Sequence, residues 1–142
     1  MSTYKSLSTA NLPDPVIDPA KGENSTDYFN AVIWTGNGTS QSITGVGHQT
    51  DWVWAKCRSL AVSHIFYDVI RGVTKRLIPD RTEAEETQTN HITSFDSDGF
   101  SLGNSDSVNK NATTYVGWSW KANGSGVSNT DGSITSTVSA NT

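Results

Sequence analysis

Large apolar and polar side chains alternate along several stretches of the chain with a period of two, which is typical of β-strands. Residues 51–58 show the alternation most clearly. One face of this segment would carry Val53, Ala55 and Cys57, and the other Trp52, Trp54, Lys56 and Arg58. Because both faces hold bulky groups, we predict an interior strand that is partly covered on each side.

Further predicted strands are short runs rich in aromatic and β-branched residues, separated by Gly, Asn and Asp turn signals. They span residues 28–34, 40–44, 64–70, 75–78, 91–95, 100–102, 113–120 and 133–138. The tight turn at 35–38 predicts that 40–44 returns beside 28–34 as a hairpin. In the segment 113–120, Val116, Trp118 and Trp120 share one face, and Tyr115 lies on the other. Residues 80–88 have a helix-friendly composition without an apolar stripe, and we expect an exposed loop there. Many short strands with almost no helix predict an all-β fold, a sandwich or a barrel.

The first 27 residues differ from this pattern and predict an extended N-terminal arm. Each X-Pro step favours extended backbone, and no strand or helix period emerges. The residues expected to dock on a partner are Leu12, Pro13, Pro15, Val16, Ile17 and Pro19. Such an arm becomes ordered only along another surface, and a terminus that stays unattached is the alternative. We predict three parts: the arm at 1–27, the β-module at 28–124, and a Gly/Ser/Thr-rich connector or strand at 125–142.

Composition indicates how the core is built. Only 34% of the residues are hydrophobic, but they include five Trp, four Tyr and four Phe. Burial of large aromatic side chains can supply most of the core, at about 1.5–3 kcal/mol for each one.

The formal net charge of -4 gives no field that attracts a polyanion, so nucleic acid is not an expected partner. We also see no signal peptide and no membrane-inserting segment. The charges are uneven, because a basic stretch from Lys56 to Arg76 precedes an acidic one from Glu83 to Asp98. The two stretches either form solvated surfaces that face each other, or provide complementary charge between neighbouring copies.

Catalytic and metal-binding chemistry are not expected. Cys57 falls on the apolar side of its strand, which predicts a buried structural thiol, and a pairing of Cys57 with His64 lacks a third orienting group. The three His and one Cys have no zinc-like spacing. Asp96–Gly99 resembles the start of a calcium loop but lacks the later Glu, so we read it as a hairpin turn. We therefore predict a protein that is not an enzyme and binds no cofactor.

Seven phrases of the sequence form an ordered set: Trp34–Thr39, Gln41–Gly47, Asp51–Lys56, Asp68–Lys75, Thr93–Gly103, Tyr115–Lys121 and Gly132–Ala140. Together they resemble a module of marine phage virion proteins of the tail-fibre type, in which the segment at 125–142 would lead to a possible further module. The resemblance implies an antiparallel, jelly-roll-like β-sandwich of the concanavalin or SPRY type. It provides no defined active site.

The resemblance also implies a location in the virion, with the chain as the proximal, anchoring part of a tail fibre. The arm would then dock on a tail or capsid protein of the same particle, and the chain would be a homo-oligomer, a trimer by analogy with fibres. One alternative is a module that recognises a host surface glycan through Trp52, Trp54, Trp118 and Trp120, although paired Trp residues also fill sandwich cores or subunit interfaces. Another is a capsid decoration or head-fibre protein.

Overall fold

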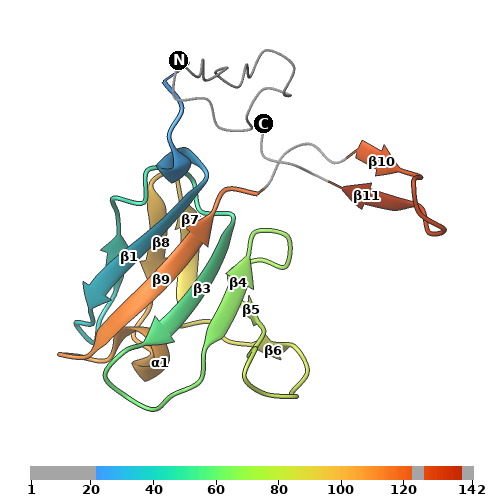
Figure 1. The fold of residues 1–142 in the computed structure, drawn as a ribbon. Helices are drawn as coiled ribbons and strands as arrows, with labels where there is room; N and C mark the ends of the chain where they lie inside the picture. Colours follow the sequence, from blue (N-terminus) through green and yellow to red (C-terminus); the bar gives the residue numbers. More distant parts are fainter. Residues whose placement is uncertain (1–21, 123–126, 139–142) are drawn as a thin grey trace, which may run out of the picture.

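The protein is an all-β sandwich of two antiparallel sheets, described over residues 22–122 and 127–138 of a computed structural model (Figure 1). One sheet has the strand order β1-β9-β3-β4, and the other has the order β2-β8-β7. The strands of the first are β1 (Phe29–Thr35), β9 (Thr114–Trp120), β3 (Trp52–Cys57) and β4 (Ile65–Asp68). Those of the second are β2 (Gln41–Ile43), β8 (Gly99–Leu102) and β7 (Ile92–Asp96). The predicted antiparallel β-sandwich is confirmed.

Smaller elements complete the described chain. Strands β5 (Lys75–Arg76) and β6 (Glu86–Thr87) pair beside β4, and β10 (Val127–Asn129) pairs with β11 (Ser136–Val138). A 3-10 turn, η2 (Ser25–Asp27), precedes β1, and a single helical turn, α1 (Asp106–Asn109), precedes β9. Neither helical segment is long or apolar enough to cross a membrane. The predicted docking residues of the arm, Leu12 to Pro19, lie outside the described residues.

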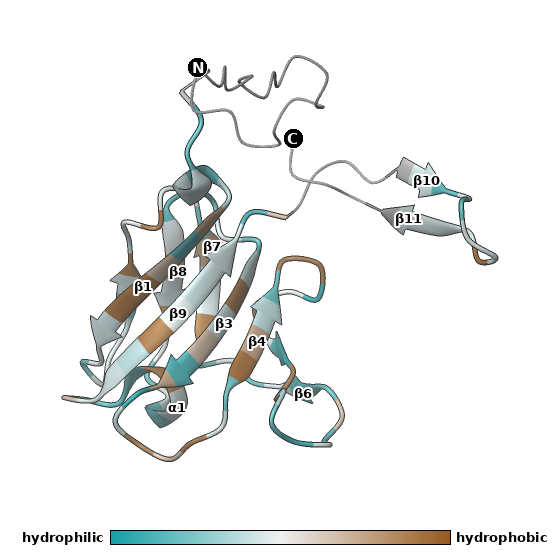
Figure 2. Ribbon diagram, in the orientation of Figure 1, coloured by the Kyte–Doolittle hydropathy of each residue, from teal (hydrophilic) through white to brown (hydrophobic). Residues whose placement is uncertain are grey.

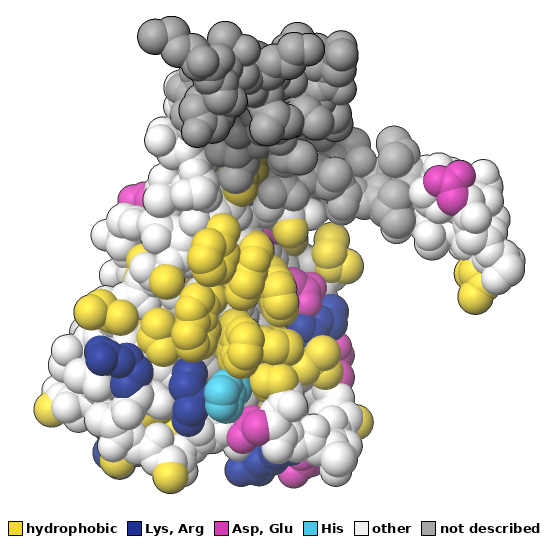
Figure 3. Space-filling model, in the orientation of Figure 1, with side chains coloured by type: hydrophobic (Ala, Val, Ile, Leu, Met, Phe, Trp, Pro, Cys, Tyr) yellow, Lys and Arg dark blue, Asp and Glu magenta, His cyan; other side chains and the backbone are white. Residues whose placement is uncertain are grey.

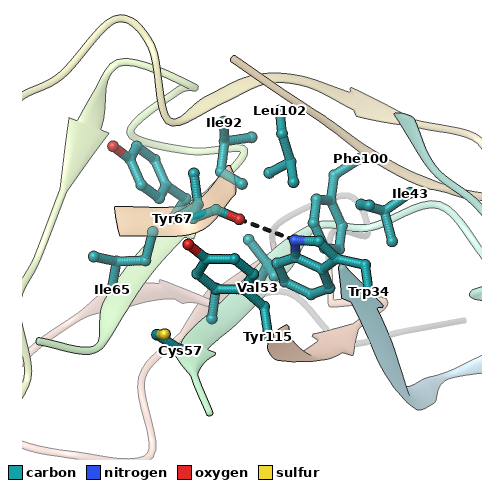
Figure 4. Packing of buried hydrophobic residues seen from close by; sticks show 12 residues of the cluster. Trp34, Ile43, Val53, Cys57, Ile65, Tyr67, Ile92, Phe100, Leu102 and Tyr115 are labelled. Atoms are coloured by element: carbon teal, nitrogen blue, oxygen red, sulfur yellow. Dashed lines mark hydrogen bonds between the residues drawn. The ribbon is translucent and has the colours of Figure 1, made fainter. Parts of the chain in front are cut away.

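The core lies between the two sheets and is built around large side chains, as the composition predicts (Figure 4). Trp34 stacks on Tyr115 with ring centroids 5.5 Å apart and meets the edge of Phe100 at 5.7 Å. The Trp34 indole Nε1 donates to the carbonyl oxygen of Val108 at 2.9 Å, so its polar atom has a partner when buried. Cys57 lies in this core with 2% of its surface exposed, which confirms a buried thiol.

Strand β3 behaves as its alternation predicts. It lies between β9 and β4, and its residues alternate strictly between buried and partly exposed. Figure 2 shows the hydrophobic positions along the strands of both sheets, with hydrophilic residues concentrated in the loop before β6.

Two features of the topology differ from the sequence-based expectation. The turn after β1 does not close a hairpin, because β1 pairs with β9 whereas β2 pairs with β8 in the other sheet. The short turn therefore connects the two layers. The strand predicted at 64–70 ends at Asp68, where the Asp68 carboxylate accepts a hydrogen bond from the Arg71 backbone N–H at 2.9 Å and closes a turn.

The hairpin of β7 and β8 confirms that Asp96–Gly99 is a turn. The Asp98 carboxylate accepts from the backbone N–H groups of Gly47 and Gly45 at 2.7 and 3.0 Å, and these bonds hold the pKa of Asp98 below its usual value. The Asp96 carboxylate accepts from two serine hydroxyls. Both carboxylates therefore stabilise the turn through hydrogen bonds.

Candidate interaction surface

The outward side of the four-stranded sheet carries a continuous group of aromatic rings, which we call the aromatic face (Figure 3). It consists of Phe29, Trp52, Trp54, Phe66, Trp118 and Trp120. On each strand these residues alternate with the buried core residues, so their side chains point to the opposite side of the sheet. The face is therefore the second, outer surface of the same sheet that covers the core.

Strand register aligns the rings in rows across the sheet. Phe29, Trp120 and Trp52 are consecutive partners from β1 through β9 to β3. In the next row the consecutive partners are Ala31, Trp118, Trp54 and Phe66. Directly opposed residues on one face of a sheet lie about 4.5–5.5 Å apart at Cβ, so the register alone brings these rings into contact.

The rings pack on one another as well as facing outward. Trp52 stacks on Trp120 with centroids 4.3 Å apart, and Phe29 contacts Trp120 at 4.9 Å. Phe66 presents an edge to both Trp52 and Trp54, each at 5.3 Å. The result is a single apolar layer whose inner ring surfaces are already occupied and whose outer surfaces remain partly exposed.

Polar groups at the margin of the face are bound within the chain. The Trp54 indole Nε1 donates to His64 Nδ1 at 3.0 Å, and Lys56 Nζ donates to the carbonyl oxygen of Val62 at 2.5 Å. At the opposite margin the Asp68 carboxylate accepts from Arg71 Nε at 2.6 Å. These contacts fix the side chains around the rings.

Exposed aliphatic residues extend the apolar surface. Ile33 lies on the outward side of β1 with 70% of its surface exposed, and Leu77, which forms a bridge to Phe66, is 38% exposed. Apolar patches that cover most of a sheet face are uncommon on isolated soluble proteins and mark interaction sites.

Comparison with known proteins gives a family but no activity. The match to the family described as "Domain of unknown function (DUF7483)" covers residues 24–142. The chain belongs to the DUF7483 family. No match to a curated protein or to a solved structure was found. The match begins after the proline-rich segment, which therefore lies outside the matched residues.

For this DUF7483 member, the structure brings together the four tryptophans that the sequence singled out. Trp52, Trp54, Trp118 and Trp120 lie side by side on β3 and β9. The alternative that these tryptophans fill the sandwich core is wrong, because their side chains point away from the core. Phe29 and Phe66 also belong to this group, although the sequence pattern alone did not predict it. Alternation along each strand is visible in the sequence, but assigning both rings to the same face requires the pairing of β1 with β9 and of β4 with β3.

The structure of the DUF7483 module does not bring together the other residues considered for catalysis or metal binding. Cys57 points into the core, whereas His64 is bonded to Trp54 on the outer surface. Within the described ranges, no three His, Cys, Asp or Glu side chains are grouped so that they could hold a metal ion. A cleft lined by Ser63, Arg76, Arg81 and Ser107 contains two guanidinium groups, but Arg76 is paired with Glu86 and Arg81 with Glu83.

The basic and acidic stretches face each other, as one of the two interpretations of their charge predicted. Arg76 Nη2 lies 2.5 Å from Glu86 Oε2, and Arg71 Nη1 lies 3.7 Å from Glu85 Oε2. These pairs hold the β5–β6 loop beside β4.

A buried histidine lies next to this ion pair. His91 is 3% exposed, its Nδ1 accepts from Arg76 Nη1 at 3.5 Å, and its ring meets the edge of the Tyr67 ring. Burial, together with the nearby Arg76 charge, lowers the pKa of His91 from 6.5 to about 4, while Glu86 opposes the shift. His91 is therefore neutral in the folded protein near pH 7.

We expect acid to destabilise the fold through His91. The unfolded chain binds a proton near pH 6.5 but the folded chain only near pH 4, so stability is lost as the pH falls through this window. The loss attributable to His91 is about 3 kcal/mol, at ~1.4 kcal/mol for each pKa unit. Urea unfolding of wild type and His91→Gln between these pH values measures it. The difference between the two free energies of unfolding should change with pH, and parallel curves would show that His91 does not titrate differently in the two states.

Proposed function

We propose that this chain is a structural module of a phage particle, the anchoring part of a fibre-type protein, and that it associates with neighbouring virion protein through the aromatic face. The virion assignment rests on the resemblance of its sequence phrases to phage fibre modules. The observation that carries the mode of action is the aromatic face, a contiguous apolar layer on the outside of a complete sandwich.

The chemistry of the face favours a protein partner. A large aromatic side chain buries about 150–250 Å² when fully covered. The six partly exposed rings, together with Ile33 and Leu77, therefore offer an apolar area on the order of several hundred Å². Aromatic residues are enriched at the centres of protein interfaces, where exclusion of water from such rings supplies most of the binding free energy.

A glycan receptor site is the second candidate, and the same geometry supports it less. Sugar rings stack on a free aromatic face and exchange hydrogen bonds with polar groups beside it. Here Trp52 and Trp120 stack on each other, and the neighbouring polar groups of Lys56, His64 and Asp68 are bonded within the chain. A capsid decoration protein would use the same surface and would differ only in where on the particle it docks.

Removal of residues 2–20 from the chain encoded by the phage tests the proposal. We expect the shortened chain to be missing from purified particles, because the arm is the segment predicted to dock on neighbouring protein in the particle. It should still fold, since the buried core residues lie between Trp34 and Tyr115. Quantitative mass spectrometry of the particles, with circular dichroism of the purified shortened chain, gives the two measurements.

A wild-type copy number of the shortened chain in the particles would contradict the anchoring role. Recovery of full-length chain only outside purified particles would contradict the virion assignment itself.

A further inference from the structure

The partner of the aromatic face can be assigned from the chain itself. We propose that the proline-rich segment Asn11–Pro19 of a second copy lies across the aromatic face. This inference rests on the function proposed above and names the partner of the same surface. In this proposal the surface on which this part of the arm becomes ordered is a neighbouring copy of the chain, and not a separate tail or capsid protein.

The segment has the composition that binds to exposed aromatic rings. It contains Pro13, Pro15 and Pro19 together with three aliphatic residues, in the order Asn-Leu-Pro-Asp-Pro-Val-Ile-Asp-Pro. Segments of this type favour the polyproline II conformation, which has no internal hydrogen bonds and loses little entropy on binding. Proline-rich peptides are bound in this conformation by aromatic-lined surfaces in several unrelated modules.

The spacing of one side of the segment matches the spacing of the rings. Polyproline II has three residues per turn, so Pro13, Val16 and Pro19 lie on one side at intervals of about 9 Å. Trp120 pairs with Trp52, so Trp54 is its diagonal neighbour, about 8 Å away. Successive residues on this side of the segment can therefore contact diagonally adjacent rings.

The length of the segment is also sufficient. Eight steps of polyproline II extend about 25 Å. The four strands of the sheet span about 14 Å, at ~4.8 Å between neighbours, and the outward positions from Trp52 to Lys56 cover about 14 Å along a strand. A segment of this length crosses the face on the diagonal and reaches both margins.

Charge at the margin complements the segment. Asn11–Pro19 contains Asp14 and Asp18 and no cationic residue. Lys56 continues the outward side of β3 beyond the tryptophans, and Arg58 follows it with its side chain exposed. Lys56 Nζ is bound to the Val62 carbonyl oxygen, whereas Arg58 takes part in none of the ion pairs between described residues. Pairing of a segment carboxylate with Arg58 would fix the direction in which the segment lies.

The attachment of the chain before β1 shows how copies would be linked. His48 Nδ1 is bonded to the carbonyl oxygen of Thr26 at 2.7 Å, and the Lys121 N–H donates to the carbonyl oxygen of Tyr28 at 2.9 Å. The chain thus enters the sheet at the end where Phe29 and Trp52 lie. A copy that covered its own face with its own segment would have no association surface left. Exchange of segments between copies covers every face and connects the copies.

Disulfide trapping in the full-length chain tests the assignment. One chain carries Val16→Cys in the segment, and a second chain carries Ala31→Cys, an exposed position beside Trp118 on the aromatic face. The native Cys57 is 2% exposed and stays out of the reaction. A matched control carries Thr93→Cys, an exposed position on β7 in the other sheet. Equimolar mixtures are oxidised with glutathione and the disulfide-linked pairs are quantified by mass spectrometry.

We expect the Val16→Cys chain to pair with the Ala31→Cys chain at least tenfold faster than with the Thr93→Cys chain. Equal rates would overturn the segment as the occupant. A third chain carries both Val16→Cys and Ala31→Cys. If its disulfide forms only within single chains and never between chains, the exchange of segments between copies is overturned. In either case the proposed function stands if copies still associate through the aromatic face, and it fails if purified particles lack the chain.

Discussion

A full-length chain that carries both Phe29→Ser and Trp118→Ser is expected to stay folded and to lose association with other copies by a factor of roughly a thousand. Each residue touches only one other ring of the face, Phe29 contacting Trp120 and Trp118 contacting Trp54, so the remaining layer is preserved. Truncation of aromatic residues at the centre of an interface commonly costs about 2 kcal/mol or more for each one. Two such losses correspond to roughly a thousandfold in a dissociation constant.

Sedimentation velocity over a range of concentrations measures this effect. The matched control carries Ile70→Ser and Ile134→Ser, which removes two side chains that are 80% and 79% exposed but lie outside the four-stranded sheet. The control should associate like the wild type. If both double variants weaken association equally, the effect is one of general surface hydrophobicity and the aromatic face is not the interface.

The second large effect is expected from Gly36→Ala, which should lower the free energy of unfolding by about 3 kcal/mol or more. An added Cβ would lie 2.2 Å from the Lys110 carbonyl oxygen, an overlap with backbone that no side-chain rotation relieves. The backbone is held on both sides, since the Gly36 N–H donates to Thr113 and the Ala112 N–H donates to Gly36. The adjacent Asn109 side chain is buried and donates to the Gly103 carbonyl oxygen at 2.8 Å.

Gly45→Ala is the matched control, because it separates steric overlap from backbone conformation. Gly45 has a φ of +81° but no atom within 4 Å of an added Cβ, so the substitution should cost only about 1–2 kcal/mol. Urea unfolding of the two variants gives the comparison. A loss for Gly36→Ala as small as that for Gly45→Ala would show that the close contact with Lys110 does not form.

Local patterns were sufficient to predict the sandwich, because an alternation such as that of Val53, Ala55 and Cys57 is set by the strand itself. They were insufficient for pairing between distant segments. The short turn after Trp34 predicted a hairpin, but β1 instead pairs with β9, about 80 residues further along the chain. Helix α1 was missed because four residues are too few to show a helical period, although Ser105 accepts from the Ser107 N–H as a cap.

The candidate site was predicted in part for the same reason. The alternation of side chains along a strand placed Trp52 and Trp54 on one side of β3, and Trp118 and Trp120 on one side of β9. Only the antiparallel register showed that these sides are the same surface, and that it is the outside of the sandwich. The close approach of Gly36 to Lys110 likewise depends on tertiary contact and leaves no mark on the local sequence.

On the proposed function, protein covers the aromatic face in the assembled virion, and a cryo-EM map of the intact particle tests this most directly. We predict density for a neighbouring chain on Trp52, Trp54, Trp118 and Trp120, with an extended segment that fits Asn11–Pro19 of a second copy. A module at a distal tip of the particle, with this face open to solvent, would contradict the account and would favour receptor recognition.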